Sequence, residues 1–226
     1  MSEFTNFSLE GKVALVTGAS YGIGFAIASA YAECGATICF NDIKQELVDK
    51  GIAAYAEKGI KAHGYVCDVT NEEAVNAMVA QIEKEVGTID ILVNNAGIIK
   101  RIPMCDMTAD EFRQVIDVDL NHVWFMCQKA VQVMKDKEGS TGKIINIASM
   151  NAFFGGTTVP AYTAAKGAVA MLTKSLASDC ADHNICCNAI APGYMDTEMC
   201  ANMTQERKDE CTKRIPAARW GLPDDL

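Results

Sequence analysis

Short apolar runs alternate with longer helical patterns along almost the whole chain. The strand-like runs cover residues 12–18, 36–42, 61–69, 89–97, 143–149 and 184–193, and the helical patterns cover 22–34, 44–58, 71–86, 108–136, 160–181 and 204–213. The strand-like runs are nearly continuous in apolar residues, which is typical of parallel strands that are covered on both faces. Alternation with short connections indicates right-handed βαβ units. We therefore predict an α/β fold in which helices cover both faces of a doubly wound parallel sheet.

Length and composition limit the class of protein. The 226 residues show no linker, repeat or composition shift that would mark a second domain, so we expect one domain over 1–226. Because the chain stops at "GLPDDL", where a helical pattern is starting, we expect that domain to lack its final helix and strand. A net charge of −9 argues against a nucleic-acid-binding protein, which needs a basic face against phosphate.

The cysteines and the N-terminal sequence indicate the cellular compartment of the protein. The ten cysteines include no CxxC pair, and several lie in apolar runs such as "TICF", so we expect reduced, mostly structural thiols. The N-terminal "MSEFTNFSLEGK" lacks a signal-peptide pattern, and no apolar run is long enough to span a membrane. His122 and His183 are expected to be structural, and no residues have metal-ligand spacing. We predict a cytoplasmic protein that binds no metal and no membrane.

A glycine-rich turn connects the first predicted strand to the first predicted helix. In "VTGASYGIG", Gly18 permits a tight turn, Gly22 permits close approach of a phosphate, and Gly24 permits close packing of helix against strand. The helix N-terminus offers free N–H groups and a partial positive charge to a pyrophosphate. The alternative is a glycine-rich turn without a ligand.

An acidic residue ends the second predicted strand. Asp42 lies 18 residues after Gly24, where a carboxylate accepts hydrogen bonds from an adenosine ribose and repels a 2′-phosphate. This favours NAD over NADP, although the nearby Lys44 softens the repulsion. Asp42 as a helix N-cap is the alternative.

Together these motifs resemble the classical short-chain dehydrogenase/reductase family, whose Rossmann-type fold spans the whole chain. The matching elements are the TGxxxGxG loop at 17–24, the NNAG motif at 94–97, Ser149 thirteen residues before the YxxxK pair Tyr162 and Lys166, and the PG motif at 192–193 with a following Thr. The resemblance implies an NAD(P)-dependent oxidoreductase, usually a homotetramer. It also implies that the cofactor contacts Gly18, Ser20, Tyr21, Gly22, Ile23, Gly24, Asp42, Asp68, Val69, Asn95, Ala96, Gly97, Tyr162, Lys166, Pro192, Gly193 and Thr197.

The spacing of Tyr162 and Lys166 has a physical explanation. Residues four apart lie on one helix face, so Lys166 is expected to lie beside Tyr162. An isolated tyrosine has a pKa near 10, and a nearby ammonium lowers that pKa by favouring the phenolate. The resemblance implies that Ser149 holds the carbonyl oxygen of the substrate, that Tyr162 transfers its proton, and that Lys166 also binds the nicotinamide ribose.

One position departs from the family pattern. Asp119 stands where the family has a catalytic asparagine that holds a proton-relay water near the lysine. A carboxylate there still accepts a hydrogen bond from water. Its charge is also expected to pair with Lys166 and to weaken the effect of Lys166 on Tyr162. We predict an active enzyme with a shifted pH optimum.

The substrate is expected to be a sugar acid. Within the family, segments such as "VNNAGIIKR" and "KIINIASM" resemble gluconate 5-dehydrogenases and deoxygluconate dehydrogenases, which implies interconversion of D-gluconate and 5-keto-D-gluconate. Arg101 follows the fourth predicted strand and suits a carboxylate, and Asn151 and Tyr194 flank the expected pocket. The segment 194–215 is expected to form a lid. The alternatives are a 2-deoxy-D-gluconate 3-dehydrogenase, a 3-ketoacyl carrier-protein reductase, a hydroxysteroid dehydrogenase and a non-catalytic NAD-sensing protein.

Overall fold

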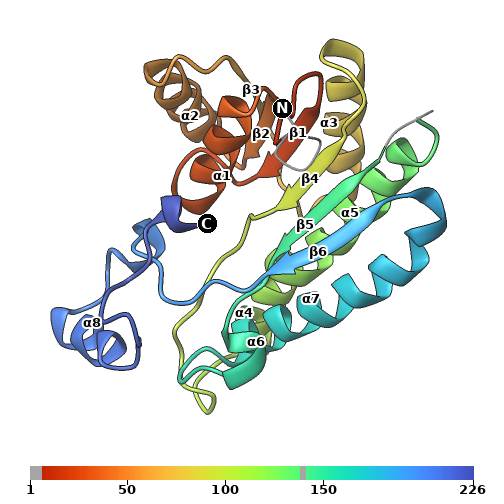
Figure 1. The fold of residues 1–226 in the computed structure, drawn as a ribbon. Coiled ribbons are helices and arrows are strands. Elements are labelled where there is room, and N and C mark those ends of the chain that lie inside the picture. Colours follow the sequence, from red (N-terminus) through yellow and green to blue (C-terminus); the bar gives the residue numbers. More distant parts are fainter. Residues whose placement is uncertain (1–6, 138–140) are drawn as a thin grey trace.

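Six parallel strands form one sheet. The computed structural model describes residues 7–137 and 141–226, so residues 1–6 of the N-terminal segment discussed above lie outside the described part. The sheet order is β3-β2-β1-β4-β5-β6 (Figure 1). The strands are β1 (Val13–Thr17), β2 (Thr37–Asp42), β3 (Ala62–Val66), β4 (Ile91–Asn94), β5 (Lys143–Ile147) and β6 (Cys186–Ile190). The predicted parallel sheet is confirmed, although several strands are shorter than the apolar runs.

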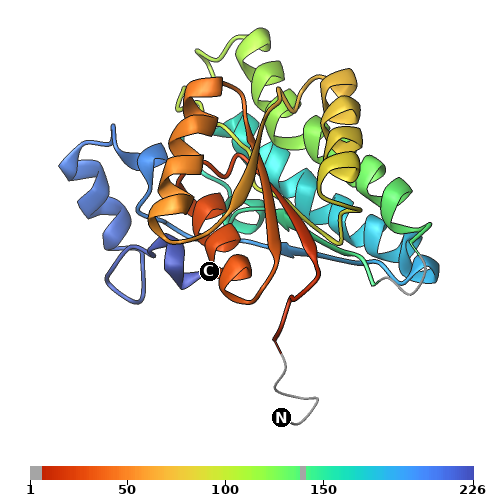
Figure 2. The same cartoon turned by 90° about the horizontal axis from the view of Figure 1, so that it is seen from above.

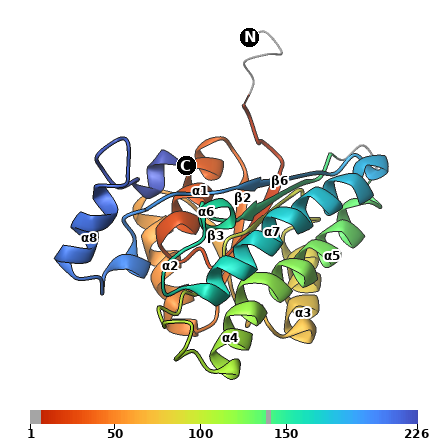
Figure 3. The ribbon, with the colours of Figure 1, turned by 90° about the horizontal axis from the view of Figure 1, so that it is seen from below.

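Helices cover both faces of this sheet. Helices α1 (Gly22–Glu33) and α2 (Gln45–Glu57) lie on one face, and α3 (Glu72–Glu85), α5 (His122–Met134) and α7 (Pro160–Asp179) lie on the other (Figures 2 and 3). Alternate side chains of β1 therefore enter two separate cores: Leu15 packs towards α3 and α5, whereas Ala14 and Val16 pack towards α1 and α2. Both faces of the strand are buried, which explains its continuous apolar sequence.

The segment expected to be one long helix over 108–136 is divided. A capping box at Thr108 and Glu111 starts α4 (Ala109–Ile116). A π-helical turn (Asp117–Asn121) follows, and α5 continues from it. Such turns are rare and occur frequently at functional sites. The periodicity of the sequence does not reveal this turn, which carries the buried Asp119.

Three smaller elements lie outside the sheet and its covering helices. The short helix α6 (Asn151–Phe154), which we did not predict, precedes α7. Helix α8 (Gln205–Thr212) matches the predicted helix at 204–213 and lies at the side of the molecule, away from the sheet (Figures 1 to 3). The turn Pro223–Asp225 returns to pack against α1.

A chain of buried polar side chains crosses the core between the sheet and α7. Asn94 on β4 donates to the Oδ1 atom of Asn146 on β5 (2.8 Å), and Asn146 donates to the Oγ1 atom of Thr173 on α7 (3.0 Å). All three residues are at least 96% buried, and hydrogen bonds of this kind offset the cost of burying amide groups.

All ten cysteines are free thiols, and six are buried, as expected for structural residues. Across the described ranges, no helix is both long and apolar enough to cross a membrane.

Candidate active site

The order of strands reverses between β1 and β4, and open α/β sheets bind ligands at the carboxyl ends of the strands at such a point. The NNAG segment connects the two strand ends there. The side-chain amide of Asn95 donates to the carbonyl oxygens of Thr17 (2.9 Å) and Gly18 (3.0 Å). The Thr17 hydroxyl in turn accepts the N–H groups of Asn95 and Ala96, both at 3.0 Å. The amide nitrogen of Asn95 thus holds the glycine-rich loop, while its predicted contact with the cofactor stays a prediction. Thr17 is a supporting residue outside our predicted set.

The glycine-rich loop has the geometry of a phosphate-binding turn. Gly18 and Gly22 have φ values of +60° and +65°, which favour glycine. A Cβ on Gly24 would lie 2.5 Å from the amide nitrogen of Asn95, so close packing requires glycine there. Helix α1 begins without a side-chain cap, and the buried hydroxyl of Ser20 has no hydrogen-bond partner. Free N–H groups and an unpaired hydroxyl fit a pyrophosphate.

Asp42 lies beside this loop at the end of β2. The pKa of Tyr21 is raised by burial and then by the charges of Asp42 and Glu198, so both carboxylates lie near the tyrosine. Asp42 accepts the N–H of Ile43 (2.8 Å), whereas Lys44 occupies the N-cap of α2. The alternative that Asp42 is the helix N-cap is therefore wrong.

A depression of about 310 Å³ continues along the same edge of the sheet. It lies between β2, β3 and α4, where an adenine ring is expected, and Asp68 is among its lining residues. The carboxylate of Asp68 accepts both the N–H (2.9 Å) and the hydroxyl (2.7 Å) of Thr70. The neighbouring Val69 is buried. The remaining predicted cofactor residues Ile23, Pro192, Gly193 and Thr197 lie in α1 and in the loop after β6.

Tyr162 and Lys166 lie one turn apart near the start of α7. The Lys166 ammonium is 5.6 Å from the centre of the Tyr162 ring. Lys166 is only 3% exposed and donates to the carbonyl oxygen of Ile147, at the end of β5, at 2.9 Å. This bond fixes the lysine against the strand that leads to Ser149. The predicted shared face of the two side chains agrees with this geometry.

Asp119 faces Lys166 from the π-helical turn. Its Oδ2 atom lies 3.4 Å from the lysine Nζ, and its Oδ1 atom accepts the N–H of Ile98 at 2.8 Å. Burial raises the pKa of Asp119 and outweighs the opposing effects of Lys166 and the Ile98 N–H. A Cβ on Gly97 would lie 3.1 Å from Oδ2, so glycine there permits the close approach. The structure brings the predicted Asp119–Lys166 pair together.

The tyrosine is less acidic than the sequence suggests. Burial and, after it, the Asp119 charge raise the pKa of Tyr162 to about 12, although the Ser149 hydrogen bond and the charge of Arg101 act in the opposite direction. The net shift of the Tyr162 pKa is therefore upward, opposite to the lowering that we expected from Lys166. Ser149, which adjoins the tyrosine, is 7% exposed and accepts the N–H of Asn151 at 3.2 Å.

His122 lies next to this cluster but is not titratable near neutral pH. Burial and the nearby Lys166 lower the pKa of His122 to about 3, although its hydrogen bond to the Val118 carbonyl opposes the change. A neutral, fully buried ring agrees with the structural role that we predicted for it.

Two predicted substrate residues have partners in the segment 194–221. The guanidinium of Arg101 donates to the Met199 carbonyl at 3.4 Å and contacts the sulfur atoms of Cys200 (4.0 Å) and Met203 (3.8 Å). The ring of Tyr194 packs against Trp220, with ring centres 5.2 Å apart. Arg101 thus contacts the segment after β6 while its charge acts on Tyr162, whereas Tyr194 packs within the C-terminal segment.

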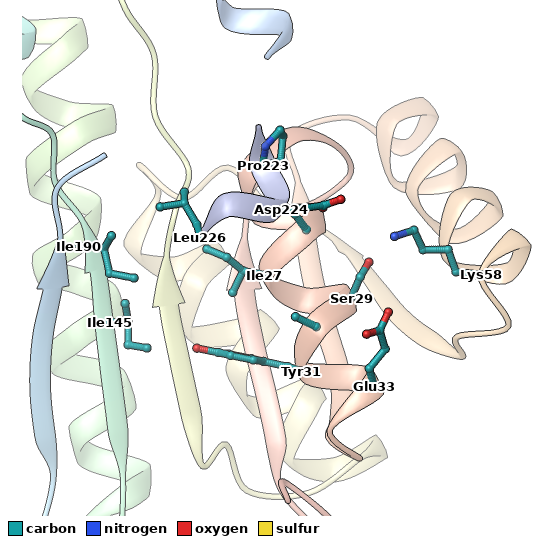
Figure 4. Close-up of a pocket in the computed structure, with 12 residues that line it drawn as sticks. Ile27, Ser29, Tyr31, Glu33, Lys58, Ile145, Ile190, Pro223, Asp224 and Leu226 are labelled. Carbon is teal, nitrogen blue, oxygen red and sulfur yellow. The ribbon is translucent and has the colours of Figure 1, made fainter. Parts of the chain in front are cut away.

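A hollow of about 370 Å³, larger than the depression beside Asp68, lies between α1 and the C-terminal turn (Figure 4). Apolar side chains from α1, β5, β6 and the C-terminal turn line most of it, with Tyr31, Glu33 and Lys58 among the polar ones. It contains none of Ser149, Tyr162 and Lys166. Within the described residues, no group of three or more His, Cys, Asp and Glu side chains is arranged to hold a metal ion.

Comparison with known proteins agrees with this geometry. The family model for short chain dehydrogenases matches residues 12–208. The chain belongs to the short-chain dehydrogenase family. It is therefore an NAD(P)-dependent oxidoreductase that acts on CH–OH groups.

Members of this family with high identity include three sugar-acid enzymes. The 2-dehydro-3-deoxy-D-gluconate 5-dehydrogenase of Formosa agariphila is 44% identical over 97% of this chain and 84% of the relative. The crystal structure of 2-keto-3-deoxy-D-gluconate dehydrogenase from Streptococcus agalactiae is 56% identical, with a TM-score of 0.81 over 98% of this chain and 85% of the other. A gluconate 5-dehydrogenase from Burkholderia cenocepacia, in complex with NADP and tartrate, is 38% identical, with a TM-score of 0.91 over 97% and 86% of the two chains.

Proposed function

We propose that this enzyme reversibly oxidises the C5 hydroxyl of a six-carbon sugar acid to a ketone. The observation that carries the proposal is the place of Arg101, whose charge acts on the pKa of the half-buried Tyr162. A guanidinium beside the proton-transferring group suits a substrate that carries a carboxylate. The names of the similar enzymes support the same substrate class and the same carbon.

The two candidate substrates are 2-dehydro-3-deoxy-D-gluconate and D-gluconate. The identities of 56% and 44% to enzymes named for the 3-deoxy acid favour that compound as the first candidate. D-Gluconate, which the sequence motifs indicated, is the second. Oxidation of 2-deoxy-D-gluconate at C3 would contradict the proposed carbon.

Each residue of the site has a proposed role. Ser149 donates a hydrogen bond to the reacting oxygen, and Tyr162 takes the hydroxyl proton during oxidation and returns it during reduction. Lys166 stabilises the phenolate, and Asp119 sets how much of the lysine charge Tyr162 experiences. The nicotinamide, when bound, accepts or donates the hydride. Because the pKa of Tyr162 is about 12, we expect oxidation to accelerate as the pH rises.

The loop geometry supports NAD as the preferred cofactor, with NADP also accepted. Asp42 lies near Tyr21 at the glycine-rich loop, where its charge repels a 2′-phosphate. Measurement of kcat/KM for both cofactors tests this preference. A higher value with NADP would contradict it.

The substrate proposal is tested by spectrophotometric assay of both candidate acids, 2-deoxy-D-gluconate and neutral polyols. Arg101→Ala should raise the KM for sugar acids about tenfold or more, because a charge-assisted hydrogen bond contributes ~1.5–3 kcal/mol. Neutral polyols should be almost unaffected. Lys100→Ala is the matched control, since it removes the neighbouring positive charge. Equal losses on acids and polyols would exclude a carboxylate contact at Arg101.

A further inference from the structure

A carboxylate from the far end of the chain lies over the glycine-rich loop. The Oε2 atom of Glu198 is 3.6 Å from the position that a Cβ on Gly22 would occupy, and among the described residues it is the only atom within 4 Å that belongs neither to Gly22 and its chain neighbours nor to the nearby backbone of α1. Glu198 begins a 3-10 turn directly after Thr197, in the loop that follows β6. An acidic side chain therefore occupies the side of the loop where Gly22 leaves room for a ligand.

The start of α1 has no other acidic partner in its own sequence. Tyr21 provides no side-chain cap, and the first turn of the helix contains no acidic residue. The free N–H groups and the helix dipole at this end attract an anion. The charge of Glu198 is felt here, because it contributes to the raised pKa of Tyr21 after burial and Asp42.

We propose that Glu198 is a displaceable anion, which holds the segment 194–203 over the phosphate-binding loop until a dinucleotide displaces it. The pyrophosphate and the Glu198 carboxylate are both attracted to the positive N-terminal end of α1. Because both are negatively charged, they repel each other there. Cofactor binding therefore includes the cost of moving Glu198 away. The carboxylate lowers the affinity for the dinucleotide and keeps the loop covered when the cofactor is absent.

Movement of Glu198 would also affect Arg101 beside the catalytic residues. The next residue in the chain, Met199, provides the carbonyl that accepts a hydrogen bond from Arg101. At 3.4 Å this bond is long, and the other partners of the guanidinium are sulfur atoms, which are weak acceptors. Displacement of the segment by the cofactor thus frees Arg101 for a new partner.

The test measures binding of NADH to the resting enzyme by fluorescence titration, without turnover. Glu198→Gln should lower the Kd for NADH about fivefold, because it removes the competing charge but keeps the size of the side chain. The matched control is Glu206→Gln, which removes an exposed charge from α8 in the same segment and should change the Kd less than twofold. In 0.5 M salt the difference between Glu198→Gln and the wild type should shrink, because salt screens exposed charges. An unchanged or higher Kd in Glu198→Gln would overturn the proposal.

A second measurement separates the covering role from the charge effect. Hydrogen exchange of residues 194–203 without cofactor should be faster in Glu198→Gln than in the wild type, and NADH should reduce that difference. Equal protection in both proteins without NADH would show that Glu198 does not hold the segment. Neither measurement requires turnover, so loss of the proposed sugar-acid activity would not affect them.

Discussion

Two buried aspartates lie at opposite ends of the strands of the same sheet. Each faces lysine, but their pKa values are shifted in opposite directions. Asp90 precedes β4 at the amino edge and accepts the Val13 N–H (3.0 Å) and the Lys137 ammonium (2.7 Å), with Lys12 at 3.6 Å. Burial acts to raise the pKa of Asp90, but these hydrogen bonds and charges lower it below its ordinary value. Asp119 at the carboxyl edge has one buried lysine at 3.4 Å, and its pKa is raised.

Neither carboxylate is exposed to solvent, but Asp119 lies deeper in the protein, and the partners of the two carboxylates also differ. Asp90 has two lysines whose side chains are 34% and 40% exposed, so these lysines retain contact with water. Lys166, the partner of Asp119, is itself buried and also donates a hydrogen bond to the Ile147 carbonyl. At the amino ends of the strands, hydrogen bonds and lysine charges therefore outweigh the cost of burying Asp90, and this ion cluster stabilises the fold. At the carboxyl ends, the partners of Asp119 do not outweigh the cost of its burial, and this pair lies beside a tyrosine.

The largest effect is expected at the carboxyl edge. Tyr162→Phe should lower kcat by about 10²- to 10⁴-fold, because it removes the group that transfers the proton. The Kd for NADH and the free energy of unfolding should change little. Tyr31→Phe is the matched control, since it removes a tyrosine hydroxyl from the hollow that contains no catalytic residue. Unchanged NADH production by Tyr162→Phe would remove the proposed mechanism.

At the amino edge the expected effect is on stability. Asp90→Asn should lower the free energy of unfolding by about 2 kcal/mol, less than the ~3–5 kcal/mol for fully buried pairs because the lysines reach water. Turnover per folded molecule should stay the same. Asp110→Asn, at an exposed ion pair, should cost less than about 0.5 kcal/mol.

The pH dependence of Asp90→Asn gives a further check on the same variant. The lowered folded pKa of Asp90 means that its contribution is present above the unfolded value near 3.9 and is lost as the pH falls through the folded value. The stability difference between wild type and variant, measured by urea unfolding, should therefore shrink as the solution is acidified below about pH 4. A difference that grows on acidification would show that Asp90 is not stabilised by its lysines.

The smallest effect is expected for Asp119→Asn. Because the Asp119 charge raises the pKa of Tyr162, its removal should shift the rising limb of the kcat profile for oxidation to lower pH by about one unit. We expect kcat at the optimum to stay within about tenfold of the wild type. The control is Asp117→Asn in the same π-helical turn, whose exposed carboxylate bonds only Asn121 among the described side chains. Complete loss of turnover with the fold intact would show that the carboxylate is required.

Local patterns of the sequence predicted the parts of this molecule that depend on local physics. The continuous apolar runs indicated a sheet buried on both faces, the spacing of Gly18, Gly22 and Gly24 indicated the phosphate loop, and the i, i+4 spacing placed Lys166 beside Tyr162. The family resemblance then supplied their chemical roles.

Features that depend on contacts distant in the chain were not predicted. The π-helical turn around Asp119, the raised pKa of Tyr162 and the packing of Tyr194 on Trp220 each depend on how separate elements meet. The same is true of Glu198 at Gly22, for which no spacing rule exists. The homotetramer and the cytoplasmic location stay predictions.

The polar chain from Asn94 through Asn146 to Thr173 has a consequence for the angular setting of α7. Only one rotation of that helix about its axis presents the Thr173 hydroxyl to the Asn146 amide. An apolar interface would tolerate small rotations, whereas here a rotation of one residue, about 100°, would leave buried amides unpaired. Since Tyr162 and Lys166 lie on the same helix, the hydrogen bonds of the core amides also fix the direction in which both side chains leave that helix.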